Sequence, residues 1–140
     1  MVYFLAKTDP DTYSIDQFAA EHHTVWDGIA NAQALRAIRA MSPGDRVFIY
    51  HSAISGGKGQ PGIVGLAAVA SPPRDEPDDP KLAVVDLEFL RKLEPSTTLH
   101  EIKASGLFSD WALVKQSRLS TMSAPDAFVK WMRARYPGLI

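Results

Sequence analysis

Apolar residues follow two kinds of pattern along the chain, and one of them predicts strands. Residues 2–6 are apolar on both faces, which is typical of a strand in the middle of a sheet. Three further runs, at 46–51, 62–70 and 82–93, have the composition and length of strands. Because short helical segments separate these runs, we expect an α+β fold with a closed or nearly closed sheet and helical insertions.

The second pattern predicts helices, and it comes with start signals. Ser14 precedes a helical stretch and Gln17 follows three residues later, the spacing of a capping box. Asn31 is a good cap for a helix beginning near Ala32. We also expect Ser123 to cap the last helix, with Asp126 in its first turn. Shorter helices are predicted at 99–104 and 109–114, and loops at 52–61 and 72–80.

Length and composition indicate an ordinary small domain. The 140 residues show no repeat and no second pattern, so we expect one domain over 1–140. The chain has no cysteine, which excludes disulfides and thiolate metal sites and fits a reducing compartment. No apolar run approaches the roughly 20 residues of a membrane span, and no signal peptide is visible. A cytoplasmic protein with no membrane partner is therefore expected, and its oligomeric state is left open.

The charge balance limits how the chain binds nucleic acid. Fifteen Lys and Arg residues face sixteen Asp and Glu residues, giving a net charge of −1. Diffuse attraction to phosphate cannot carry binding at this charge. A nucleic-acid partner would require a local basic patch and a specific pocket.

An enzyme is the first alternative, and the sequence gives it little support. Asp27, His51 and Ser52 are the residue types of a hydrolytic triad, but neighbours on a strand point to opposite faces. No histidine pair has the spacing of a zinc protease, and the glycine-rich segment 55–59 lacks phosphate-loop spacing. We therefore predict neither a metal nor a cofactor. An enzyme using Asp27 and His51 on small molecules or nucleotides stays as the alternative, and Lys58 could touch phosphate.

Polar and aromatic residues gather at strand ends, which indicates a binding pocket. Lys7 and Thr8 end the first strand, and Trp26 lies beside irregular chain. A tryptophan there is a platform for a planar ring, and base–aromatic stacking is worth roughly 1–3 kcal/mol per base. On pattern alone, a core position is the commoner outcome for Trp26, and also for Tyr13 and Tyr50.

These segments resemble the EVE domain family in order and spacing over nearly the whole chain. The matching segments are Lys7-Thr8-Asp9-Pro10, Tyr13-Ser14, Trp26-Asp27-Gly28-Ile29-Ala30-Asn31-Ala32-Gln33-Ala34, Gly44-Asp45, Ile49-Tyr50-His51-Ser52, Pro61-Gly62-Ile63-Val64-Gly65 and Arg118-Leu119-Ser120-Thr121.

The resemblance implies a PUA-like fold, a small mixed β-barrel decorated with short helices and similar to YTH and ASCH domains. It also implies a non-catalytic reader of a modified nucleobase, chiefly modified cytosine in DNA, with RNA as a second substrate class. By this similarity Trp26 is a wall of an aromatic pocket and Arg118 reaches phosphate. The implied base-binding set is Lys7, Thr8, Trp26, Gly28, Asn31, Gln33, Tyr50, His51, Ser52, Arg118, Leu119 and Ser120, with Arg36, Lys58 and Arg118 on phosphate.

The chain also departs from the family pattern. Ala30 stands where the family has arginine, and Ala32 where it has tyrosine. Leu35 and Arg36 replace an arginine–asparagine pair. These changes remove a rim contact and enlarge or weaken the pocket. A degenerate member that serves as a protein-interaction module is therefore a further alternative.

Overall fold

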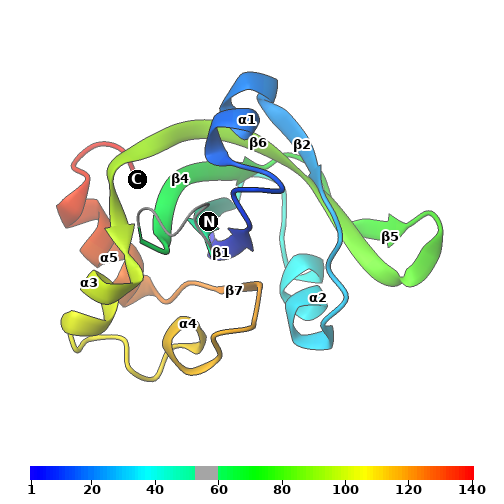
Figure 1. The fold of residues 1–140 in the computed structure, drawn as a ribbon. Helices are drawn as coiled ribbons and strands as arrows, with labels where there is room; N and C mark the ends of the chain where they lie inside the picture. The colour runs from blue at the N-terminus through cyan, green and yellow to red at the C-terminus, as the bar shows by residue number, and fades with distance from the viewer. Residues whose placement is uncertain (53–59) are drawn as a thin grey trace.

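A strongly curved mixed sheet lies at the centre of the molecule, with short helices around it (Figure 1). The computed structural model describes residues 1–52 and 60–140. Its strands are β1 (Tyr3–Thr8), β2 (His23–Trp26), β3 (Arg46–His51), β4 (Gly62–Val69), β5 (Arg74–Glu76), β6 (Asp79–Thr98) and β7 (Thr121–Ser123). They pair in the order β2-β6-β4-β3-β1-β7, and β5 pairs with β6. Since β2 and β7 are the two ends of this order, the described sheet is barrel-like without closing. The predicted α+β fold is confirmed.

The first strand is paired on both sides within the sheet, although it lies next to the end of the strand order. β1 pairs in parallel with β3 and antiparallel with β7. It continues through Lys7 and Thr8, which lie opposite Tyr50 and His51. Because parallel strands run in the same direction, the polar residues that end β1 and β3 meet at one edge of the sheet.

The helices begin where two of the three predicted caps place them. They are α1 (Ile15–Glu21), α2 (Ala32–Arg39), α3 (Leu99–Ala104), α4 (Ala112–Lys115) and α5 (Asp126–Arg135). Ser14 and Gln17 form the capping box of α1, and the Asn31 side chain accepts from two backbone N–H groups at the start of α2. None of the described helices has both the length and the apolar composition needed to cross a bilayer.

The predicted cap of the last helix is wrong. Ser123 belongs to β7, where it lies opposite Phe4 in the ladder with β1. The helix begins after Pro125, which makes no side-chain cap bond, and only Asp126 keeps its expected place in the first turn. Pairing with β1 therefore places Ser123 in a strand, although its local sequence pattern predicts a helix cap.

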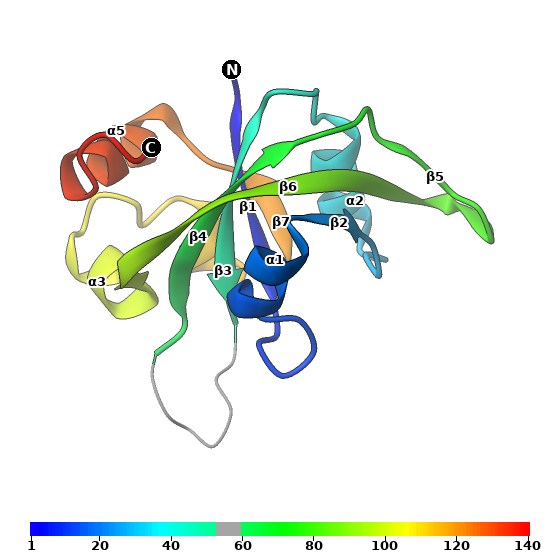
Figure 2. The same ribbon diagram turned by 90° about the horizontal axis from the view of Figure 1, so that it is seen from above.

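The strand predicted at 82–93 is the middle part of a much longer one. β6 has 20 residues, and its first part forms a hairpin with β5 that projects from the body of the sheet (Figure 2). β5 lies within the segment predicted as an acidic loop at 72–80. Gly62 of β4 lies very close to β6, since a Cβ there would lie 2.5 Å from the Thr97 carbonyl oxygen.

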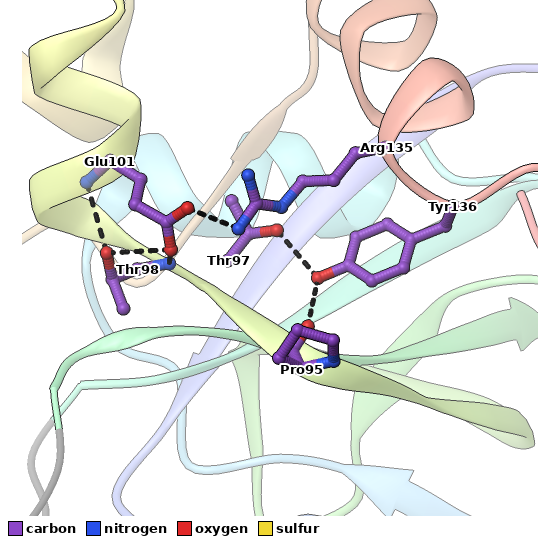
Figure 3. Close-up of polar contacts among 6 residues, drawn as sticks. All are labelled: Pro95, Thr97, Thr98, Glu101, Arg135 and Tyr136. Carbon is purple, nitrogen blue, oxygen red and sulfur yellow. Dashed lines mark hydrogen bonds and ion pairs between the residues drawn. The ribbon is translucent and has the colours of Figure 1, made fainter.

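Polar contacts fasten the end of α5 to the junction of β6 and α3 (Figure 3). The Tyr136 hydroxyl donates to a backbone carbonyl of β6 and bonds to the Thr97 hydroxyl at 2.7 Å. Arg135 pairs with Glu101. A backbone N–H bond from Thr98, followed by the Arg135 pair, holds the pKa of Glu101 below its ordinary value. These contacts fix the position of α5 relative to the sheet.

Candidate functional site

A hollow of about 320 Å³ lies beside Trp26, where β1 ends. This volume is at the lower end of the range of ~300–1,000 Å³ that is usual for small-ligand pockets. The end of β1, the loop before α1, and β2 with its following loop supply the walls. The lining residues are Lys7, Thr8, Thr12, Tyr13, Thr24, Val25, Trp26, Asp27 and Ile29.

The sequence allows Trp26 to be either a core residue or a pocket wall, and in the structure it is both. It ends β2, and its ring centroid lies 6.3 Å from those of both Phe18 and Tyr13, so most of the indole is packed. The residue is 6 % exposed, and it lines the hollow. None of the hydrogen bonds among the described residues uses the indole N–H. This donor is therefore available to a ligand.

The turn after Trp26 carries the chain toward α2. Asp27 is exposed and lines the hollow. Gly28 has a φ of 74°, a conformation that side chains disfavour, and it does not itself line the hollow. The family's Trp-Asp-Gly sequence thus provides an aromatic wall, an acceptor and a sharp turn.

Lys7 joins the end of β1 to the chain segment before β7. Its ammonium donates to the Ser117 carbonyl at 3.0 Å and lies 5.3 Å from the centroid of the Tyr50 ring. Partial burial lowers the pKa of Lys7. Tyr50 itself is buried in the core, and burial raises its pKa to about 12, so it supports Lys7 and does not line the hollow.

A second hollow of about 300 Å³ lies along this segment. Asn31 and Arg118 both line it, together with Lys115. The Asn31 side-chain oxygen accepts from the N–H groups of Gln33 and Ala34, which leaves its amide donors for other partners. Two predicted site residues from distant parts of the chain therefore share one hollow, and the Lys7–Ser117 contact links it to the first.

Three predicted residues instead make bonds that hold the loop before α1. The His51 ring accepts the Ile15 N–H at Nε2, at 3.1 Å, and burial lowers the pKa of His51. Ser52 donates its N–H to the Thr8 carbonyl at 3.0 Å, and the Thr8 hydroxyl donates to the Tyr13 carbonyl at 2.8 Å. Of these, only Thr8 lines the Trp26 hollow. No hydrogen bond within the described ranges joins Asp27 to His51, so the geometry gives the enzyme alternative no support.

The remaining predicted residues divide between a third hollow, the sheet and a segment outside the described residues. Gln33, Arg36 and Leu119 line a hollow of about 800 Å³ between α2, α4 and β7. This is the largest of the hollows described here, but Trp26 does not line it. The Ser120 carbonyl accepts from the Lys7 N–H at 2.8 Å as an extension of the β1–β7 ladder. Lys58 lies outside the described residues.

Tyr13 lines the hollow, although its sequence pattern alone favours a core position. Its hydroxyl donates to Glu21 at 2.5 Å, and burial, followed by that bond, raises its pKa. A half-buried tyrosine with its ring edge against Trp26 contributes a second aromatic wall. The available signal was the Tyr13-Ser14 pair, which the family resemblance includes.

The curved sheet, the capped helices and an aromatic hollow at strand ends define an α+β domain with a barrel-like sheet. The chain belongs to the EVE domain family, whose sequence profile matches residues 2–135. The expected resemblance is thereby confirmed. Thymocyte nuclear protein 1 of the rat is 31% identical over 128 residues, covering 72% of this chain and 55% of the rat protein. The chain thus spans about half the length of the curated relatives it matches.

Solved structures have the same fold. A protein of Rhodopseudomonas palustris is 32% identical with a TM-score of 0.83, covering 94% of this chain and 90% of that one. The human THYN1 protein, solved in complex with DNA containing 5-methylcytosine, has a TM-score of 0.84 and covers 96% of this chain and 97% of its own. At 24% identity, this second likeness shows the fold.

Proposed function

We propose that residues 1–140 act as one EVE domain that binds a modified nucleobase, with modified cytosine in DNA as the leading ligand and RNA as a second. The hollow beside Trp26 carries this proposal, because it combines aromatic walls, an indole N–H without an acceptor among the described residues, and polar groups at strand ends. The family membership supports it, as does the human THYN1 protein, whose structure was solved with 5-methylcytosine DNA.

The hollow is large enough for a single base, and a base that enters it must leave its stack. Flipping a base out of a duplex costs a few kcal/mol. Stacking on an aromatic wall returns roughly 1–3 kcal/mol. Asp27 adds a chemical match, since carboxylates accept hydrogen bonds from the exocyclic amine of cytosine. A methyl group adds only about 1–3 kcal/mol of discrimination in a fitted site.

The cations near the hollow supply the local positive charge that the whole chain lacks. Lys7 borders the Trp26 hollow, while Lys115 and Arg118 border the hollow next to it. Arg36 lines the third hollow. We infer that the nucleic-acid backbone runs along these residues, with Arg118 and Arg36 on its phosphates.

The domain acts without catalysis in this proposal. The His51 nitrogen that an enzyme would use as a base accepts the Ile15 N–H, and the residue is 9 % exposed. A cytoplasmic location also remains part of the proposal, and fluorescence microscopy of the tagged chain tests it.

The test is the affinity for short single strands that carry one 5-methylcytosine or one cytosine, prepared as DNA and as RNA. We expect the methylated DNA to bind at least fivefold more tightly, a difference of about 1 kcal/mol. Trp26→Phe keeps most of the packing but removes the indole donor, so it weakens binding by a similar factor.

Trp111→Phe is the matched control, because it makes the same chemical change in the other half of the core. The proposal fails if both variants bind like the wild type. It also fails if Trp111→Phe, at equal folded fraction, weakens binding as much as Trp26→Phe does.

A further inference from the structure

Three arginines from three different elements surround one hollow at the far end of β1. Arg46 of β3, Arg91 of β6 and Arg133 of α5 line a space of about 370 Å³ beside Tyr3. Tyr3 and Arg46 form the first pair of the parallel β1–β3 ladder, whereas Thr8 and His51 form the last. We propose that this hollow is an anion site that binds a phosphate group.

The charge of the side chains around this hollow is not balanced. No acidic side chain among the described residues lines it. Three of the other five arginines have carboxylate partners, namely Arg39 with Asp75, Arg74 with Asp86 and Arg135 with Glu101. Among the residues that the structure describes, Arg46, Arg91 and Arg133 form no ion pair. Three like charges around one space repel one another, and a bound anion relieves that repulsion.

Most of the guanidinium donors of these three arginines also lack acceptors within the part of the chain that the structure describes. The described bonds are those of Arg46 to the Gly44 carbonyl at 2.6 Å and of Arg133 to the Tyr3 hydroxyl at 3.4 Å. The Nε atom of Arg91 is buried and has no partner within the described ranges. A buried donor without an acceptor is costly, so an anion that accepts from it is favoured.

Phosphate fits these groups better than a single carboxylate does. Guanidinium groups bind phosphate oxygens through pairs of parallel N–H bonds, and several oxygens allow more than one arginine to take part. Arg133 lies 5.7 Å from the centroid of the Tyr3 ring, and α5 is fixed by the contacts of Figure 3. The hollow also has apolar walls, including Leu66 and Leu90, which suit the organic part of a phosphate ester.

This site is separate from the Trp26 hollow. In Figure 2 the N-terminus lies at one side of the sheet, and α1, which follows the Trp26 end of β1, lies at the other. Phosphate binding here therefore does not rest on the proposed function. A small phosphate ester and the terminal phosphate of a nucleic-acid strand share the required chemistry.

Titration with inorganic phosphate, followed through the arginine Nε–Hε signals in NMR spectra, tests the site. We expect saturable shifts at Arg46, Arg91 and Arg133 in the wild type. Arg133→Gln, at an exposed position that leaves folding intact, raises the dissociation constant at least tenfold. Arg39→Gln removes the same charge from an arginine that has a carboxylate partner, and it leaves the constant within twofold. Shifts that do not saturate, or equal effects of the two variants, would overturn the proposal.

Two further arms test whether the site takes the terminal phosphate group of an organic molecule. Glycerol phosphate and a short DNA with a 5′-phosphate compete with inorganic phosphate, whereas the same DNA with a 5′-hydroxyl does not. Competition by the hydroxyl strand as strong as that by the phosphorylated strand would contradict a site for a terminal phosphate group. Trp26→Phe leaves the phosphate titration unchanged, so failure of the base-reader proposal is distinguishable from failure of this one.

Discussion

Trp26 and Trp111 have almost the same burial but different surroundings. They are 6 % and 9 % exposed, and each lines a hollow. The Trp111 indole donates to the Ser123 carbonyl at 3.0 Å, and its ring lies 4.5 Å from that of Phe128. The indole N–H of Trp26 has no acceptor among the described residues. Burial therefore does not separate these two tryptophans, whereas the state of the indole N–H does.

The largest effect is expected from removing the packing tryptophan. Trp111→Ala leaves a cavity beside Phe128 and an unpaired Ser123 carbonyl, so the free energy of unfolding falls by about 3–5 kcal/mol. Urea denaturation followed by circular dichroism measures this loss. Trp131→Ala, at a half-buried position on α5, serves as the control and costs less. Equal losses would show that Trp111 is not a special packing residue.

A smaller effect separates the two indole N–H groups. Trp111→Phe and Trp26→Phe remove the same atoms, but only the first leaves a protein carbonyl without its donor. We expect Trp111→Phe to lower the free energy of unfolding by about 1 kcal/mol more than Trp26→Phe does. The same urea experiment measures both. If Trp26→Phe proved the more costly change, the Trp26 N–H would have an unrecognised partner within the protein.

The smallest effect is a dependence on pH confined to the Trp26 half of the molecule. His51 accepts the Ile15 N–H, and burial lowers its pKa in the folded state. Its contribution to stability is therefore complete above the unfolded pKa of about 6.5, and it is lost as the pH falls from there through the folded pKa. We expect His51→Gln to remove this part of the pH dependence of the free energy of unfolding.

The exposed His23→Gln is the control for this titration and should retain the pH dependence. In variants that keep only Trp26 or only Trp111, the fluorescence of Trp26 should change over the same pH range while that of Trp111 stays constant. A change at Trp111 alone would contradict the assignment to His51.

Features set by neighbouring residues were predictable from the sequence, and features set by strand pairing were not. The caps at Ser14 and Asn31 follow from side chains that bond their own helix, and both are confirmed. Ser123 has the same local signal, but its pairing with β1 places it in a strand. β5 lies in an acidic, proline-containing segment, and it is a strand because β6 pairs with it.

The candidate site likewise has features that the sequence predicts and features that depend on tertiary packing. The sequence motifs predict three site residues that do line one hollow, namely Lys7, Thr8 and Trp26. Their role in binding stays a prediction. The bond between His51 and Ile15 could not be predicted, because it depends on how α1 packs over the end of β3. Tyr50 belongs to a segment that resembles the family, and it is buried beneath Lys7, as its sequence pattern alone favours.

The bond from Lys7 to Ser117 spans 110 residues, so the two hollows beside it are complete only when both ends of the domain are folded. A fragment lacking the segment before β7 would keep Trp26 but lose the partner that holds Lys7. A ligand that occupies both hollows would thus select the intact domain over every partly folded form. At a concentration of 100 times its dissociation constant, such a ligand would add about 2.7 kcal/mol to the free energy of unfolding, so its binding would report complete folding.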